Sequence, residues 1–144
     1  MSRTLDANIL LYASDRESPC HEQAREEIER CSKGPEPLYL FWPVIVAYLR
    51  ISTHPSVFAQ PLRLADASGN IERLLERRHV RAPGEDQGFW RTFSAAATEA
   101  SARGSLVPDA HIVALMRQYG VGTIVTRDRD FRRFEGVRVR DPYE

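Results

Sequence analysis

The apolar residues of this chain form short blocks whose spacing changes along the sequence. Some blocks are brief, continuous and rich in β-branched or aromatic side chains, which is typical of buried strands. Strands are predicted at residues 4–6, 38–41, 79–83, 122–126 and 137–140. Between them, longer segments repeat apolar residues at helical spacing. These segments predict an apolar helix or turn at 7–13 and helices at 19–30, 42–53, 64–78, 87–97 and 107–119.

Local residue types indicate where several helices begin and end. Ser18 followed by Pro19 is typical of an N-cap and a proline at the first helical position. Asp86 is predicted to cap the helix that follows it, and Asp109 stands at the start of the last long helix. Gly120 comes just past the end of that helix, where a glycine commonly stops it.

Strands therefore alternate with helices along the whole chain. This order favours an α/β fold with a central parallel sheet flanked by helices on both faces. The loops at 33–37 and 81–88 do not look like domain linkers, because the same alternation continues on both sides, so one domain over residues 1–144 is predicted. In such sheets, ligands bind beyond the carboxyl ends of the strands.

Aspartates stand at the predicted carboxyl ends of two strands. Asp6 follows the first strand, Asp128 and Asp130 follow the strand at 122–126, and Asp109 begins the helix before that strand. Neighbouring strands would bring these carboxylates together, where they repel one another unless a cation is present. Oxygen ligands of this kind suit Mg²⁺ or Mn²⁺, which can activate water and stabilise a phosphoryl oxyanion. The pattern therefore predicts metal-assisted hydrolysis of phosphodiester bonds.

Each aspartate taken alone has a simpler structural interpretation. Asp6 and Asp128 could each initiate a turn, and Asp130 could pair with a neighbouring arginine at the surface. Asp109 could cap its helix, because free amide groups and the helix dipole favour a carboxylate there. The metal hypothesis depends on the set of four acids rather than on any one of them.

Composition narrows the class of protein. The chain has 144 residues, of which 42% are hydrophobic and 28% charged, enough for one globular core. Its net charge is zero, although every basic residue except Lys33 is an arginine, the side chain that contacts phosphate in a bidentate manner. Cys20 and Cys31 lack zinc-site spacing and are predicted to be free thiols. No apolar run could span a membrane and the N-terminus is unlike a signal peptide, so a cytoplasmic location with no membrane partner is expected.

Four segments of the chain resemble one known family. They are LDANILLYA, FWPVIVAYLRISTHPSVF, LVPDAHIVAL and TRDRDFRRF with GV following. In this order they are similar to PIN-domain ribonucleases, and most of all to the VapC-type toxins of bacterial toxin–antitoxin pairs. The resemblance implies a PIN fold, an acidic Mg²⁺ or Mn²⁺ site and endonucleolytic cleavage of RNA. It also implies a homodimer that is silenced by a cognate VapB-like antitoxin.

The resemblance also assigns roles to individual residues. Asp6, Asp109 and Asp128 match the catalytic, metal-binding acids of the family. Thr126 belongs to the T-x-D motif and helps to shape the site. Asp130 stands where many members have a further acid or an asparagine, so it is the weaker candidate for a metal ligand.

One position departs from the family pattern. The second acid is usually a glutamate three residues before the arginine of the Leu-Arg pair, and here that position is Ala47. Either Asp130 and water molecules compensate for the missing carboxylate, or the site is weaker or inactive. The alternative function is therefore a PIN-like module that binds RNA or protein without cutting it.

Polar and basic residues beside the acids are candidates for binding substrate phosphate. Asn8 could orient a carboxylate or bind phosphate, and capping of the following helix is its structural alternative. Arg127 and Arg129, with the arginines at 132 and 133, form a basic edge beside the acids. Such an edge suits a phosphate backbone, and a solvated run of charge explains it equally well.

Overall fold

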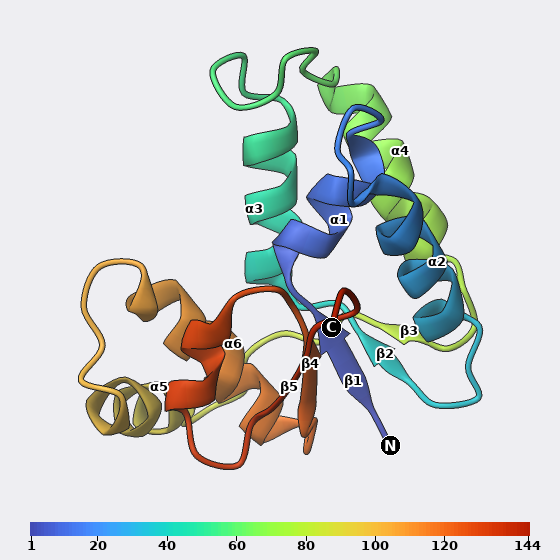
Figure 1. Cartoon of the computed structure of the whole chain (residues 1–144). Helices are drawn as coiled ribbons and strands as arrows, with labels where there is room; N and C mark the ends of the chain where they lie inside the picture. The colour runs from blue at the N-terminus through green and yellow to red at the C-terminus, as the bar shows by residue number, and fades with distance from the viewer.

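The computed structural model describes all residues 1–144, in which strands and helices alternate along the chain (Figure 1). The five strands are β1 (Arg3–Leu5), β2 (Leu38–Tyr39), β3 (Val80–Arg81), β4 (Thr123–Val125) and β5 (Arg138–Arg140). The helices are α1 (Ala7–Ser14), α2 (His21–Ser32), α3 (Trp42–Ser52), α4 (Leu64–Leu75), α5 (Phe89–Glu99) and α6 (Leu106–Gln118), with the 3₁₀ helix η1 (Arg129–Arg133).

The strands form one sheet in the order β3-β2-β1-β4-β5, and every neighbouring pair is parallel. β1 lies at the centre, with Arg3 opposite Leu38 of β2 on one side and Thr123 of β4 on the other. Because the pairs are parallel, the carboxyl ends of all five strands meet at one edge of the sheet. The predicted α/β class with a central parallel sheet is confirmed.

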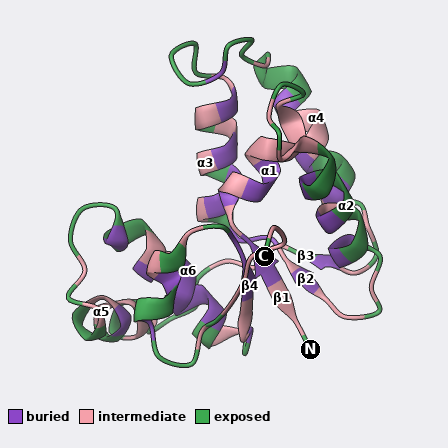
Figure 2. Cartoon of the chain, in the orientation of Figure 1, coloured by how far each residue is buried: buried purple, intermediate pink, exposed green.

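Both faces of the sheet are covered. Successive side chains of a strand point to opposite faces, and Thr4 and Leu5 of β1 are both fully buried, as are Ile124 and Val125 of β4. In Figure 1 the helices α1 to α4 form one group beyond the strand ends, whereas α5 and α6 pack against each other beside β4 and β5. The buried residues, purple in Figure 2, line the sheet and the inner sides of these helices. They form one hydrophobic cluster of 28 residues.

Two of the predicted helix starts are wrong. α2 begins at His21 rather than at Pro19, and the Ser18 hydroxyl accepts the N–H of Cys20 in the turn before the helix. Asp86 does not cap α5, because Gly88 in a left-handed conformation (φ 87°) starts that helix and the Asp86 carboxylate accepts from Gln118 instead. In both cases the conformation of the preceding loop determines the first helical residue.

The end of α6 follows the prediction. Gly120 adopts φ 66°, and the N–H of Val121 bonds to the carbonyl of Met116 at 2.8 Å, the closure expected of a glycine-terminated helix. This stop directs the chain from α6 into β4. None of the helices has the length and apolar character that crossing a membrane requires.

Candidate metal centre

The sheet brings aspartates from distant parts of the chain to its carboxyl edge. Asp6 directly follows β1, and its N–H bonds to the carbonyl of Val125, the last residue of the neighbouring β4, at 3.0 Å. Asp128 comes three residues after Val125 and begins η1, which also carries Asp130. Asp109 reaches the same edge from the first turn of α6. The adjacency of β1 and β4 is thus what places acids from opposite ends of the sequence together.

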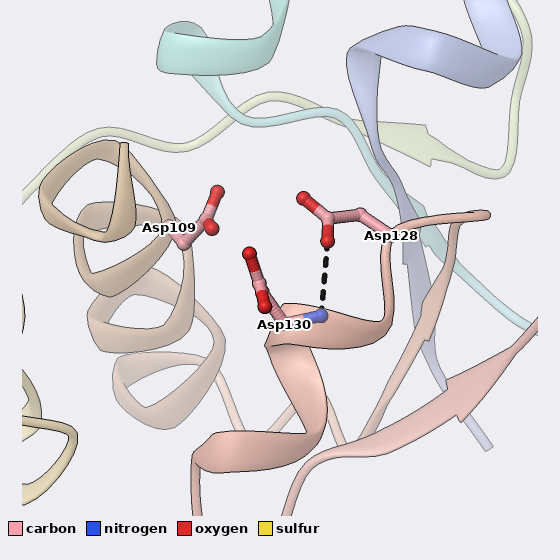
Figure 3. A group of neighbouring side chains, drawn as sticks. All are labelled: Asp109, Asp128 and Asp130. Carbon is pink, nitrogen blue, oxygen red and sulfur yellow. Dashed lines mark hydrogen bonds between the residues drawn. The ribbon is translucent and has the colours of Figure 1, made fainter. Parts of the chain in front are cut away.

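Three carboxylates form a tight group. One oxygen from each of Asp109, Asp128 and Asp130 lies within 4.8 Å of the others. Figure 3 shows the Asp109 side chain extending from α6 toward the two acids of the η1 segment. Asp6 is outside this group of three, although it is close enough for its charge to act on Asp109. Asp130, the weaker candidate on sequence grounds, is therefore a member of the most compact set.

The buried hydroxyl of Thr126 links two of the residues that carry the acids. Thr126 is fully buried. Its Oγ1 donates to Oδ2 of Asp6 at 2.8 Å and accepts from the N–H of Asp128 at 2.9 Å. The side-chain amide of Asn8 donates to the same oxygen at 3.2 Å. All the hydrogen-bonding capacity of this hydroxyl is used, so it orients the Asp6 carboxylate and holds the backbone of Asp128 in place.

Two of the converging acids also cap a helix. Asp6 caps α1, because its Oδ1 accepts the N–H of Ala7 at 2.7 Å. Asp128 caps η1, because its Oδ1 accepts the N–H of Asp130 at 2.9 Å. Asp109 has no such role: α6 begins three residues earlier, and the Asp109 carboxylate accepts no hydrogen bond from the protein. The interpretation of Asp109 as a helix cap is therefore wrong.

The electrostatics identify Asp109 as the least compensated acid. Burial raises its pKa from 3.8 to about 7, with further contributions from the charges of Asp128, Asp6 and Asp130. Burial also raises the pKa of Asp6, opposed by the hydrogen bonds from Thr126 and Ala7 and reinforced by the charge of Asp128. The negative charge of Asp130 is partly balanced by Arg133, whose Nε lies 3.7 Å from the Asp130 carboxylate.

The donor set fits a hard divalent cation. All candidate ligands are carboxylate oxygens, and those of Asp109 and one oxygen of Asp128 have no partner in the protein. Oxygen ligands that repel one another are the set that Mg²⁺ and Mn²⁺ bind. One further acceptor, Oδ1 of Asn8, is buried without a hydrogen-bond partner. Asn8 does not cap α1, since Asp6 does, so its contact with Thr126 is its only side-chain bond here.

The two predicted phosphate-binding arginines point to other partners. Arg127 donates to Sγ of Cys20 at 3.1 Å and stacks over the ring of Tyr143 at 4.7 Å. Arg129 pairs with Glu144 at 2.9 Å. These partners cannot be predicted from the sequence, because contacts between residues so far apart in the chain leave no local pattern.

Ala47 lies on α3, is partly buried against the core, and belongs to a helix that contains no acidic residue. The position of the missing family glutamate is therefore not filled by a neighbouring acid of the same helix. The remaining acids come from β1, α6 and the segment after β4.

An all-parallel α/β sheet with clustered acids at its carboxyl edge defines a class of candidate metal-binding domains. Within that class, the PIN domain family model matches residues 4–137, so the chain belongs to the PIN-domain family. The family predicted from the four sequence segments is confirmed.

Individual relatives extend this match over the whole chain. The chain is 49% identical over 143 residues to Ribonuclease VapC48 of Mycobacterium tuberculosis, covering 99% of each protein. VapBC2 from Rickettsia felis, solved bound to a DNA fragment from its promoter, has a TM-score of 0.70 at 15% identity, over 97% of this chain and 98% of that one. A toxin–antitoxin complex from Klebsiella pneumoniae has a TM-score of 0.67 at 19% identity, over 99% and 98%. The solved structures support the same fold.

Proposed function

We propose that this protein is a Mg²⁺- or Mn²⁺-dependent endoribonuclease that hydrolyses RNA phosphodiester bonds and acts as the toxin of a toxin–antitoxin pair. The observation that carries the proposal is the group of Asp109, Asp128 and Asp130 oxygens within 4.8 Å, with no hydrogen bond to Asp109. The 49% identity to a protein named as a ribonuclease supports the same activity.

The residues of the site have distinct tasks in this reaction. A divalent ion held there would lower the pKa of a bound water and neutralise charge on the phosphoryl oxygens. Asp109 supplies an uncommitted carboxylate, and Asp128 supplies one oxygen that makes no bond within the protein. Thr126 holds the Asp6 carboxylate and the Asp128 backbone, and the N–H of Asp130 holds the Asp128 carboxylate, so little reorganisation is needed when ligands bind. Asp130 supplies a carboxylate to the metal site, in place of the glutamate that the family usually has at the position of Ala47.

The proposed assembly is a homodimer that a VapB-like antitoxin silences. Relatives of this fold were solved as toxin–antitoxin complexes, which supports a protein partner. Trp42 and Val46, one turn apart on α3, expose apolar side chains, as does Leu64 at the start of α4. The two neighbouring exposed apolar side chains on α3 suit a contact with a second copy. The single sheet and single core support one domain over residues 1–144.

The alternative proposal is a PIN-like module that binds RNA or protein without cutting it. The specific observation in its favour is that α3 offers Ala47 and no acid to the site. A site with one carboxylate fewer binds a divalent ion less tightly. The domain would then bind RNA or protein and would not cut RNA.

Cleavage of transfer and ribosomal RNA by the purified protein separates the two proposals. Wild type should cut RNA with Mg²⁺ and stop when a chelator is added, and Asp109→Asn should not cut. Asp66→Asn is the matched control, because Asp66 is an exposed aspartate on α4 that makes only a surface pair with Arg63 at 3.9 Å. RNA that binds but stays intact with wild type, in Mg²⁺ and in Mn²⁺, would favour the non-catalytic module.

A further inference from the structure

The segment RDFRRF, residues 129–134, places three kinds of side chain on three sides of η1. A 3₁₀ helix has 3.0 residues per turn, so residues three apart lie one above the other. Phe131 of η1 is buried in the core, as is Phe134, which follows the helix in an extended conformation. Asp130 and Arg133 form the second pair, in contact at 3.7 Å. The third pair, Arg129 with its neighbour at 132, is exposed to solvent and lies beside the pair that contains Asp130.

The third pair already holds a carboxylate. Arg129 Nη2 lies 2.9 Å from Oε1 of Glu144, and Arg132 Nη2 lies 3.8 Å from Oε2 of the same side chain. All three side chains are about half exposed or more. Two guanidinium groups thus face the two oxygens of one singly charged group. The two non-bridging oxygens of a phosphodiester carry the same charge and accept the same hydrogen bonds.

The contact with Glu144 is weak enough to be exchanged. Solvent-exposed ion pairs contribute little because water and salt screen them and the long side chains lose entropy. Arg127 differs, since it is held by Cys20 and Asp141 and by stacking on Tyr143. Arg133 is engaged by Asp130, a member of the acid group itself. The pair at 129 and 132, whose only partner is the exposed Glu144, is therefore the one that can turn to a substrate.

We propose that Arg129 and Arg132 bind a backbone phosphate of the RNA next to the one that is cut, and that the Glu144 carboxylate competes for this pair. The proposal rests on RNA being the ligand, as in the proposed function. Asp130 and the arginine pair occupy neighbouring sides of η1. A phosphate bound by the arginines therefore lies next to the acid group. The arginines thereby set the register of the strand across the acids.

RNA binding without cleavage tests this site. The parent protein is the Asp109→Asn variant in Mg²⁺, the probe is a short fluorescein-labelled single-stranded RNA, and fluorescence anisotropy is measured over a range of salt concentrations. Replacing both Arg129 and Arg132 by alanine should weaken binding about tenfold. The logarithmic salt dependence should become shallower by about 0.7, the value for one phosphate contact on a single strand.

The matched control is Arg138→Ala, which removes an exposed arginine without an ion pair at the amino end of β5 and should leave binding unchanged. Glu144→Gln should tighten binding about threefold, because it removes the competing charge. That gain should disappear when both arginines are alanine. All of these side chains are exposed, so the melting temperature should stay at the parent value.

Two results would overturn the phosphate site. One is a double arginine variant that binds RNA as the parent does, with the same salt dependence. The other is a Glu144→Gln gain that persists without the arginines. The nuclease proposal fails separately: if the unmodified protein does not cut RNA while the arginine variants still lose binding, the phosphate site stands. If RNA is cut but the arginine variants bind normally, only the phosphate site is lost.

Discussion

The Thr126 hydroxyl donates a 2.8 Å hydrogen bond to Oδ2 of Asp6, a residue 120 positions earlier in the chain. The same oxygen accepts the N–H of Asp128 at 2.9 Å. Asp6 follows β1 and Asp128 follows β4, so one side chain links the ends of two adjacent strands. The geometry of the acids therefore depends on a residue that need not touch the metal or the substrate.

Replacing Thr126 by valine should reduce RNA cleavage by tenfold or more while the fold persists. Valine keeps the shape but leaves the partly buried Asp128 N–H without its partner, which costs about 1 kcal/mol or more. The expected effects are a lower melting temperature, weaker Mn²⁺ binding by calorimetry and a lower kcat. Thr126→Ser retains the hydroxyl and should recover most of the metal affinity. Equal metal affinity in the valine and wild-type proteins would show that this hydroxyl does not position the acids.

The metal-free protein should lose stability as the pH rises between 3.8 and about 7, the ordinary and the folded-state pKa of Asp109. In that interval the folded protein keeps a proton that the unfolded chain has released. Stability falls with pH wherever the folded state binds more protons than the unfolded chain. The stabilisation from the Asp109 proton is therefore complete below pH 3.8 and is lost as the pH rises through about 7. The raised pKa of Asp6 acts in the same direction.

Melting temperatures of wild type and Asp109→Asn in a chelating buffer measure this effect. The variant should melt at a higher temperature than wild type at pH 8, with a flatter pH profile, because it cannot develop the repelling charge. Asp66→Asn should follow the wild-type profile. A variant that is less stable than wild type at pH 8 would instead indicate that the Asp109 carboxylate stabilises the fold.

Adding Mg²⁺ should raise the melting temperature of wild type at neutral pH. A ligand that binds only the folded state stabilises it by about 2.7 kcal/mol at a concentration one hundred times its Kd. Asp128→Asn and Asp130→Asn should each lose most of this gain, since both residues belong to the group within 4.8 Å. An unchanged gain in Asp130→Asn would remove that residue from the set of ligands and leave the position of Ala47 uncompensated.

Glu27 should be the acid whose loss destabilises the fold most. It is fully buried, and its carboxylate pairs with Arg30 on α2 and with Arg140 on β5. The Arg140 carbonyl in turn accepts the N–H of Thr126 at 3.0 Å. The pair of Glu27 with Arg140 therefore also supports the position of Thr126 beside the acids. Glu27→Ala should lower the free energy of unfolding by about 1.5–3 kcal/mol, the usual contribution of hydrogen bonds to a charged group, because the arginines that lose their partner are partly exposed and regain water.

The control for Glu27 stands two residues further along the same helix. Glu29 makes an exposed pair with Arg77 at 2.9 Å, and exposed pairs contribute about 0–1 kcal/mol. Glu29→Ala should therefore change urea unfolding only slightly. Equal losses in the two variants would contradict the difference in burial between them.

The sequence by itself determined the order of elements and the edge at which the acids stand. Apolar periodicity is a local property, so the blocks around Leu5 and Ile124 predict strands, and an aspartate that follows a strand in a parallel sheet must lie at the carboxyl edge. It did not determine the starts of α2 and α5, because loop conformations such as the left-handed Gly88 set them.

Only the tertiary structure decided which of these residues meet. β1 pairs with β4 across more than one hundred residues of sequence, and this pairing brings Asp6 to Thr126. The structure also selected Asp130 for the compact group and turned Arg127 toward Tyr143. Distances between side chains depend on strand order and packing, and a local pattern contains no information about either.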